Sequence, residues 1–480
     1  MKLVTRLNSR MYKRLLILIV LFSAFTYSPQ SAYAQAGIVG PIYVVQAGDS
    51  LSSIASRFSV SIDDLMSANE ITDANSLFAG QQLVIPGLEG VTGTFSTEDI
   101  NFGDSFRSLI RRTQVPLPLF KKINRIISPS EFHVGAKMIV PVEAGTQTLN
   151  TRMTSTIGES LLELAIKNNT DTWTLSHYNK LQGTWDGIPG DTLLAAGLNS
   201  DQAISGLPSA FISAEIEGLP IKQGGTMVIK IKTDPGVTLG GSLVDHPLHF
   251  FPVEDGTQVA LQGVHALILP GVYPIRLEAT LPDGSKQSYE QFIPITSGNY
   301  LTGENLPVDP FLIDPAVTEP EQQQLEGITL PATPIKYWAN QFLSPASNYA
   351  ETTFPTSFYG TSRVYLGQGT DLKINWWHTG IDFGGGTGLP ITAPAAGQVV
   401  FAGFLTVRGN ATIIDHGWGV YSGFWHQSEI QVQVGDVIEQ GQVIGLVGGT
   451  GRVTGPHLHW ELWVNGIQVD PLDWLNQAYP

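Results

Sequence analysis

Two histidines, His457 and His459, stand one residue apart in the stretch GPHLHWELW, which runs from Gly455 to Trp463. Apolar and polar residues alternate after the glycine and proline, so the stretch is expected to form a strand that follows a turn. Side chains at positions i and i+2 of a strand point to the same side, about 7 Å apart, so both imidazoles face one place. The apolar side of a core rarely holds two neighbouring imidazoles, whereas a metal site uses them.

Another histidine lies four residues before a carboxylate, in His378-Thr379-Gly380-Ile381-Asp382. Gly380 lets the backbone turn between them, so both side chains can reach one ion. Catalytic zinc takes three protein ligands of the histidine or carboxylate kind and keeps one position for water. His378, Asp382 and one strand histidine supply such a set, and the other strand histidine can act as a base or hold developing charge. The spacing predicts a zinc site for hydrolysis, although manganese or cobalt could use the same ligands.

Short strands separated by glycine turns must position these residues. Five of the ten histidines fall in the final quarter of the chain: His378, His416, His426, His457 and His459. The segments GQVVFAG, ATIIDHG, YSGFWHQ and QVIGLVGG read as strands there. We therefore expect an antiparallel β domain over residues 345–475. His416 stands where a strand meets a turn, and a structural hydrogen-bonding role is expected for it.

The order of these segments resembles the lysostaphin-like zinc metallopeptidases, which cut peptide bridges in bacterial peptidoglycan. The matching pieces are HTGID, VVFAG, IIDHGWGVYSGFWH and VQVGDVIEQGQVIGLVGGTGRVTGPHLHWEL, from about Phe354 to Asp473. The resemblance implies the zinc ligands His378, Asp382 and His459, and the catalytic histidines His426 and His457. Phe424 and Gln427 stand where the family commonly has tyrosine and leucine, so the substrate contacts can differ although the histidine between them is kept.

An internal repeat occupies the first two hundred residues. Gly48-Asp49-Ser50-Leu51 recurs at a constant spacing as Gly103-Asp104-Ser105-Phe106 and Gly158-Glu159-Ser160-Leu161, and Asn69 recurs as Asn124 and Asn179. Each copy reads as a strand, two helices and a closing strand, with the serine capping the first helix. The copies, residues 42–87, 97–142 and 152–196, are therefore expected to be βααβ units.

The first copy resembles the LysM domain, which binds N-acetylglucosamine chains such as peptidoglycan or chitin. It matches through YVVQAGDSLSSIASRF, Asn69 and the closing LVIP. The resemblance implies glycan binding around Gly48, Asp49, Ser50 and Asn69. The second and third copies are degenerate, and a purely structural role stays open for all three.

The middle of the chain changes pattern twice. Residues 207–297 hold short alternating strands, which predicts an immunoglobulin-like β-sandwich; His246, His249 and His265 are interpreted as packing or surface residues. Residues 301–336 are rich in proline and have no sustained period, so an extended linker or wrapping segment is expected. The sandwich and this linker are expected to set the reach of the last domain.

The first 34 residues have the order of a secretory signal peptide, although a membrane anchor is the alternative. Basic residues precede the apolar run LLILIVLFSAF, and Ala32-Tyr33-Ala34 ends the segment. The run is shorter than the roughly 20 residues that span a bilayer, so export without a lasting membrane span is favoured. With no cysteine the chain has no disulfides, and its net charge of -16 disfavours nucleic acid as a partner.

The sequence as a whole predicts a multidomain, mainly β protein with LysM-like repeats, a β-sandwich and a C-terminal metallopeptidase domain. The function it favours is that of an exported zinc endopeptidase that cuts stem-peptide or cross-bridge amides of peptidoglycan. One alternative is a non-catalytic scaffold that activates another wall hydrolase; such relatives typically lose zinc ligands, and none is lost here. A second is a zinc peptidase for another protein or peptide, against which the LysM-like repeats argue.

Overall fold

The computed structural model describes residues 40–88, 91–142, 149, 151–155, 158–188, 191–196, 205–346 and 355–480. The expected signal peptide, residues 1–34, lies outside this range. Within the described residues, no helix combines the length and the apolar character needed to cross a membrane. The chain divides into two compact units, Met1–Thr94 and Phe95–Pro480.

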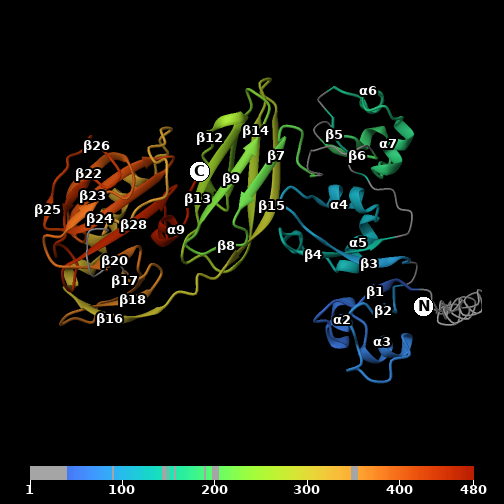
Figure 1. The fold of residues 1–480 in the computed structure, drawn as a ribbon, viewed down its shortest axis with the longest axis horizontal. Coiled ribbons are helices and arrows are strands. Elements are labelled where there is room, and N and C mark those ends of the chain that lie inside the picture. Colours follow the sequence, from blue (N-terminus) through green and yellow to red (C-terminus); the bar gives the residue numbers. More distant parts are fainter. Residues whose placement is uncertain are drawn as a thin grey trace, which may run out of the picture. The chain divides into compact units, whose positions relative to one another are not determined.

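The first unit contains a βααβ repeat, as predicted (Figure 1). Strand β1 (Ile42–Val44) pairs antiparallel with β2 (Gln82–Val84), and helices α2 (Leu51–Phe58) and α3 (Ile62–Ala68) lie between them in the chain. Ser50 caps α2 by accepting a hydrogen bond from the backbone N–H of Ser53. The buried apolar side chains of the repeat include Tyr43, Leu51, Ile54, Leu65 and Leu83.

Two further βααβ repeats begin the second unit. The second repeat contains β3 (Thr94–Asp99), α4 (Phe106–Thr113), α5 (Leu117–Asn124) and β4 (Lys137–Val142), with a 3₁₀ turn at Pro129–Glu131. The third contains β5 (Thr151–Thr154), α6 (Leu161–Lys167), α7 (Thr172–Tyr178) and β6 (Thr192–Ala195), with a 3₁₀ turn at Thr184–Asp186.

The repeated asparagine has the same structural role in all three copies. Asn69 donates to the carbonyls of Leu65 and Val84, both at 2.8 Å, and its side-chain oxygen accepts from the N–H of Val84. Asn124 and Asn179 make the same pairs with their own second helix and closing strand. The side chain thus satisfies backbone groups that the short strand leaves unpaired, which explains its recurrence.

Two sheets follow and enclose an apolar core. The first has the order β11-β10-β14-β15-β8 and the second β12-β13-β9-β7. Their bounds are β7 (Ser213–Glu217), β8 (Ile221–Lys222), β9 (Thr226–Lys232), β10 (Thr238–Leu243), β11 (His246–Pro247), β12 (Phe251–Pro252), β13 (Thr257–Gly263), β14 (Gly271–Thr280) and β15 (Lys286–Thr296). Buried residues of both sheets share one cluster, including Ile229, Ala260, Leu277 and Ile293. A sandwich is therefore present; its immunoglobulin-like topology stays a prediction.

The proline-rich segment is folded and not extended, and of the two expected forms, a linker or a wrapping segment, its packing on the last domain agrees with the second. It forms β16 (Thr302–Val308), a 3₁₀ turn (Pro310–Ile313) and the 15-residue helix α8 (Pro315–Thr329). Pro315 stands at the first helical position, where proline is tolerated, and Asp314 caps the helix. Leu325 of α8 is buried with Tyr421, Trp425 and Trp463 of the last domain. Tertiary packing, which composition does not reveal, explains the difference.

The last domain is built on an eight-stranded sheet with the order β17-β20-β28-β24-β23-β22-β26, and β29 pairs with β28. Smaller sheets have the orders β21-β27-β25 and β16-β18-β19. The bounds are β17 (Pro355–Ser357), β18 (Ser362–Gly367), β19 (Lys373–Trp377), β20 (Ile381–Gly384), β21 (Pro390–Thr392), β22 (Gly397–Leu405), β23 (Gly409–Gly417), β24 (Val420–Gln427), β25 (Glu429–Ile430), β26 (Val437–Ile438), β27 (Val443–Leu446), β28 (His457–Val464), β29 (Ile467–Val469) and the helix α9 (Pro471–Asn476). The mainly β fold class is confirmed.

The sandwich shares an apolar core with this last domain. Phe251 of β12 stacks on Trp418 with ring centroids 5.1 Å apart, and the indole of Trp474 donates to the hydroxyl of Thr226 at 3.0 Å. Asn465 donates to the side-chain oxygen of Gln262. The sandwich is therefore packed rigidly on the last domain, and its expected effect on the reach of that domain stays a prediction.

Candidate active site

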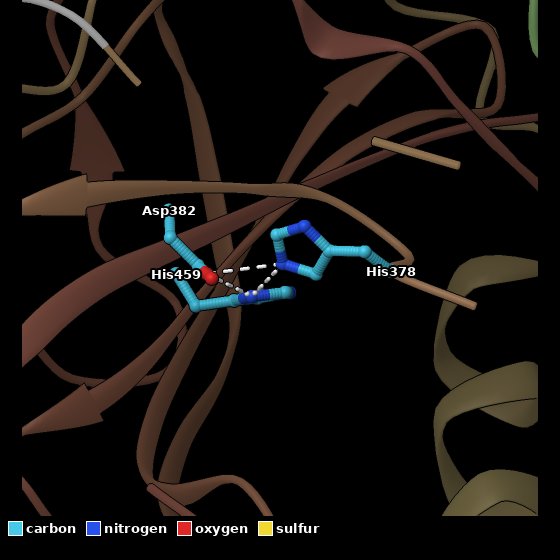
Figure 2. A group of neighbouring side chains, drawn as sticks. All are labelled: His378, Asp382 and His459. Atoms are coloured by element: carbon cyan, nitrogen blue, oxygen red, sulfur yellow. Dashed lines mark hydrogen bonds and ion pairs between the residues drawn. The ribbon is translucent and has the colours of Figure 1, made fainter. Parts of the chain in front are cut away.

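Asp382 and His459 face each other on two paired strands. Asp382 lies on β20 and His459 on β28, and the two are direct partners in the antiparallel register. Figure 2 shows how His378, in the turn before β20, points to the same place. Oδ1 of Asp382 lies 2.7 Å from Nδ1 of His459 and 3.0 Å from Nε2 of His378. Three atoms able to ligate a metal therefore converge on one point.

Carbonyl groups determine which nitrogen of His378 faces that point. Nδ1 of His378 lies 2.9 Å from the carbonyl oxygen of Phe358. A carbonyl can only accept, so Nδ1 carries the proton and Nε2 keeps its lone pair toward Asp382 and His459. This is the tautomer that a metal ligand requires.

Glu461 orients the other imidazole. Its Oε1 lies 3.2 Å from Nε2 of His459 and accepts a hydrogen bond from the hydroxyl of Thr379. Its second oxygen accepts from the side-chain amide of Gln468 at 2.9 Å. The contact leaves Nδ1 of His459 for a metal, in the carboxylate-histidine-metal arrangement common around bound ions.

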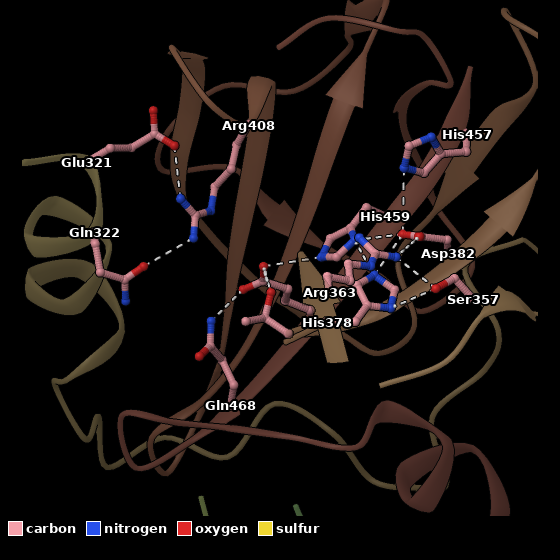
Figure 3. Close-up of polar contacts among 12 residues, drawn as sticks. Glu321, Gln322, Ser357, Arg363, His378, Asp382, Arg408, His457, His459 and Gln468 are labelled. Carbon is pink, nitrogen blue, oxygen red and sulfur yellow. Dashed lines mark hydrogen bonds and ion pairs between the residues drawn. The ribbon is translucent and has the colours of Figure 1, made fainter. Parts of the chain in front are cut away.

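Arg363 holds the second oxygen of Asp382. Its Nη2 donates to Oδ2 at 2.8 Å and to the hydroxyl of Ser357 at 2.7 Å, as Figure 3 shows among its dashed contacts. Arg363 lies on β18, which pairs with β19 and so approaches the site from outside the main sheet. Oδ1 of Asp382 therefore remains directed at the two imidazoles.

The electrostatics of the group favour a cation. Burial lowers the pKa of His378 to about 4. Burial raises the pKa of Asp382, but the neighbouring His378 and His459 outweigh it and hold that pKa well below its usual range. Burial also opposes a charge on His459, yet Asp382 and then Glu461 raise its pKa. Asp382 is thus ionised and His378 neutral at neutral pH, which are the protonation states in which these side chains can ligate a metal ion.

His426 and His457 border the group from neighbouring strands. Their ring centroids lie 5.0 Å apart, and Nε2 of His457 lies 3.6 Å from Oδ1 of Asp382. Nδ1 of His426 donates to the carbonyl of Thr450 and Nδ1 of His457 to that of Gly455, both at 2.8 Å. Burial, and then His457, hold the pKa of His426 well below its usual range. His426 is therefore neutral at neutral pH, and its Nε2 is the unprotonated nitrogen because Nδ1 carries the proton.

All five predicted residues line one cleft of about 410 Å³. Its walls also include Leu306 and Val308 of β16, Trp376 and Trp377 of β19, and three arginines, Arg363, Arg408 and Arg452. His416 lies elsewhere and is fully buried, where it bonds to Ala396 and Ser422. Its expected structural role is confirmed.

The residues predicted to bind glycan serve the fold of the first repeat. Asp49 accepts from the hydroxyl of Tyr43 at 2.7 Å and from the N–H of Gln46, and its side chain is only 8% exposed. Ser50 caps α2, and Asn69 joins α3 to β2. Gly48 has a φ of +89° and open space beside it. Glycan binding there stays a prediction.

The same position in the second repeat is covered by the chain itself. A Cβ on Gly103 would lie 3.2 Å from Ser205 and 3.4 Å from Leu207. The N–H of Gly103 donates to the side chain of Gln291, and the Tyr289 hydroxyl donates to the carbonyl of Asp104. The second repeat therefore docks on β15 of the sandwich through the surface that corresponds to Gly48-Asp49-Ser50.

Sequence reasoning missed Arg363, Glu461 and Ser357. Glu461 could have been found, because it follows His459 by two residues in the same strand and so shares its face. Arg363 and Ser357 carry no such signal, since their approach depends on how β17 and β18 pair with β20 and β19.

Two family descriptions match the chain: Peptidase family M23 over residues 377–471 and LysM domain over residues 43–86. DD-carboxypeptidase/endopeptidase Mpg of Neisseria meningitidis serogroup B is 45% identical over 20% of this chain and 22% of that protein. Peptidoglycan DD-endopeptidase ShyC of Vibrio cholerae serotype O1 is 42% identical over 20% of this chain and 22% of that protein. The solved structure of lysostaphin from Staphylococcus simulans is 35% identical over 21% of this chain and 44% of that chain, with a TM-score of 0.20.

The chain spans about a fifth of the length of the curated relatives it matches. The two family matches cover the five predicted site residues and the first repeat, where the two sequence resemblances lie. Residues 377–471 therefore form a domain of Peptidase family M23, and residues 43–86 form a LysM domain.

Proposed function

We propose that this protein is an exported, zinc-dependent endopeptidase that hydrolyses stem-peptide or cross-bridge amide bonds of peptidoglycan. His378, Asp382 and His459 are its metal ligands, and His426 and His457 its catalytic histidines. The observation that carries the proposal is the convergence of His378 Nε2 and His459 Nδ1 on Asp382 Oδ1, beside two further imidazoles.

The donor set suits zinc, because zinc favours imidazole and carboxylate and leaves a fourth position open in catalytic sites. A zinc ion held there would act as a Lewis acid and lower the pKa of a water molecule. Nε2 of His457 and Nε2 of His426 are free to take a proton from the attacking water, because both Nδ1 atoms are fixed as donors. The imidazole that gains the proton becomes a donor that can stabilise the negative oxygen of the tetrahedral intermediate.

The relatives' names bear on the bond that is cut. The Neisseria and Vibrio proteins are named for DD-endopeptidase activity. Their similarity to this chain over the catalytic domain favours an amide between two D-configured centres as the bond cleaved here.

The proposed organisation is a signal peptide (residues 1–34), a LysM domain (42–87), two docked LysM-like repeats (97–142 and 152–196), a sandwich (207–297) and the peptidase domain (345–475). Binding of the LysM domain to glycan would raise the local concentration of stem peptide at the cleft without changing the chemistry. The non-catalytic scaffold is disfavoured, because all five functional positions are filled and hydrogen-bonded.

The proposal is tested with the purified full chain after its metal has been removed with a chelator. We expect the stripped protein to leave a suspension of peptidoglycan sacculi turbid, and zinc to restore clearing. A matched variant, His416→Gln, changes a histidine outside the cleft and should respond to zinc as the wild type does. Equal clearing by stripped and zinc-loaded protein would overturn the metal-dependent mechanism.

A further inference from the structure

Three arginines line the catalytic cleft, and two of them have carboxylate partners. Arg363 donates to Asp382 at 2.8 Å, and Arg408 donates to Glu321 of α8 at 2.9 Å, as Figure 3 shows. Arg452 differs from both. Among the described residues, no carboxylate lies within ion-pair distance of its guanidinium, which instead lies 4.1 Å from the ring centre of Tyr365.

The contacts of Arg452 leave most of its hydrogen-bonding capacity unused. Nη1 donates to the carbonyl of Leu312 at 3.2 Å, which accounts for one of the five N–H donors. Burial lowers the pKa of this side chain, and Arg408 and Arg363 lower it further, whereas Glu321 acts on it only from beyond ion-pair distance. A cation in this position gains more from an anionic ligand than an exposed arginine does.

The backbone holds Arg452 in a fixed place near the reacting groups. Its N–H donates to the carbonyl of Val407 at 2.7 Å, and Gly451 before it, at φ +78°, packs against Gly409 so closely that a Cβ would lie 2.4 Å from its nitrogen. Val453 and Thr454 continue the cleft wall, and the same loop leads into β28 at His457. A ligand bound to Arg452 is thereby held at a fixed position relative to His457.

We propose that Arg452 binds a free carboxylate of the stem peptide next to the bond that is cut, so that the enzyme prefers acidic stem peptides to amidated ones. This inference rests on the proposed function. A carboxylate accepts two parallel N–H bonds from a guanidinium, and Tyr365 holds the guanidinium plane from one face. A carboxamide of the same shape carries no charge and offers only one acceptor oxygen.

The test compares soluble cross-linked muropeptides in which each free carboxylate has been converted, one at a time, to its carboxamide. For one of these amides, we expect the kcat/KM of the wild-type full chain to be at least about tenfold lower than for the corresponding acid. Loss of one hydrogen-bonded ion pair produces a difference of this size. Arg452→Gln should bring that ratio close to one, and Arg452→Lys should keep part of it. Arg276→Gln, which removes the same charge from an exposed site on β14, should keep all of it.

The substrate ratio separates this role from a structural one. If Arg452 only fastens Leu312, Arg452→Gln will lower cleavage of every substrate alike, and the unchanged ratio overturns the proposal. Equal rates of wild-type protein on every acid and amide overturn it as well, without using a variant. If no muropeptide is cleaved although sacculi are, the soluble fragments are replaced by sacculi of low and high amidation, on which equal rates overturn the inference. If neither muropeptides nor sacculi are cleaved, the proposed function fails, and the inference about Arg452 fails with it.

Discussion

His426 and His457 stand side by side on neighbouring strands, and each donates its Nδ1 proton to a backbone carbonyl 2.8 Å away. Neither carbonyl can donate in return, so Nε2 is the unprotonated nitrogen of both rings, and that of His457 lies 3.6 Å from Oδ1 of Asp382. His426 is held in this place at a φ of +65°, a backbone conformation uncommon outside glycine and frequent at functional sites. The pair is therefore fixed in one tautomer before substrate arrives.

Loss of either free imidazole should slow the chemistry while the metal is retained. We expect His457→Ala and His426→Ala to lower kcat by roughly 100-fold or more, the contribution typical of a positioned acid or base. Metal content, measured by atomic emission on the purified variants, should equal that of the wild type. A variant that has lost its metal would show instead that the histidine is a ligand.

Glu461 should control metal affinity through His459. We expect Glu461→Gln to weaken zinc binding by roughly 10- to 100-fold, since its carboxylate fixes and polarises the ligating ring. Competition against a chromogenic chelator measures this constant directly. Glu429→Gln, which changes an exposed glutamate on β25, serves as the matched control. Equal affinities of wild type and Glu461→Gln would contradict the assignment.

Asp470 should make stability depend on pH. Burial raises its pKa to about 6 at the first turn of α9, where its backbone N–H donates to Gly224 of the sandwich. A raised folded-state pKa favours the protonated form, so stability present below the ordinary pKa near 4 is lost as the pH rises through 6. The shift corresponds to at most about 3 kcal/mol, and partial exposure reduces this to about 1–2 kcal/mol.

The matching experiment is thermal denaturation of Asp470→Asn and wild type at pH 4 and pH 7. In the wild type, Oδ1 of Asp470 caps α9 by accepting from the N–H of Leu472. The side-chain oxygen of the asparagine can accept the same hydrogen bond. We expect the variant to gain stability relative to wild type on going from pH 4 to pH 7. The same difference at both pH values would show that Asp470 does not carry the effect, and Asp371→Asn controls for loss of an exposed charge.

Gln291 should hold the second repeat on the sandwich. It accepts from the N–H of Gly103 at 2.9 Å and donates to the carbonyl of Asn101 at 3.0 Å. Gln291→Leu leaves the buried N–H of Gly103 without its acceptor, which should cost about 1–3 kcal/mol, whereas the carbonyl of Asn101 keeps the N–H of Asp104. Chemical denaturation measures the loss, and the exposed neighbour Glu290→Gln should show none. Equal stabilities of Gln291→Leu and wild type would contradict docking through this contact.

Local sequence patterns predicted the parts of the structure that local physics determines. The HLH strand and the HTGID turn could be predicted because each puts its ligands within a few residues, and β20 and β28 then pair Asp382 with His459. The three βααβ repeats could be predicted because Asn69, Asn124 and Asn179 each satisfy the same backbone groups.

The predictions that failed, and the contacts that were not predicted, depend on packing between segments that are distant in the sequence. The proline count of residues 301–336 predicted an extended chain, but burial of Leu325 against Trp425 stabilises α8 on the main sheet. The stack of Phe251 on Trp418 fixes the sandwich to the peptidase domain, and no periodicity in either segment indicates it. Arg363 reaches Asp382 only because β18 and β19 pair.

Mass spectrometry of peptidoglycan digested by the zinc-loaded full chain tests the central claim most directly. We predict fragments with new free peptide amines and matching carboxylates from one kind of amide bond, and none of them with His457→Ala. Muropeptides that are bound but left uncut, or identical fragments from wild type and His457→Ala, would contradict the claim that this cleft is a metal-dependent endopeptidase.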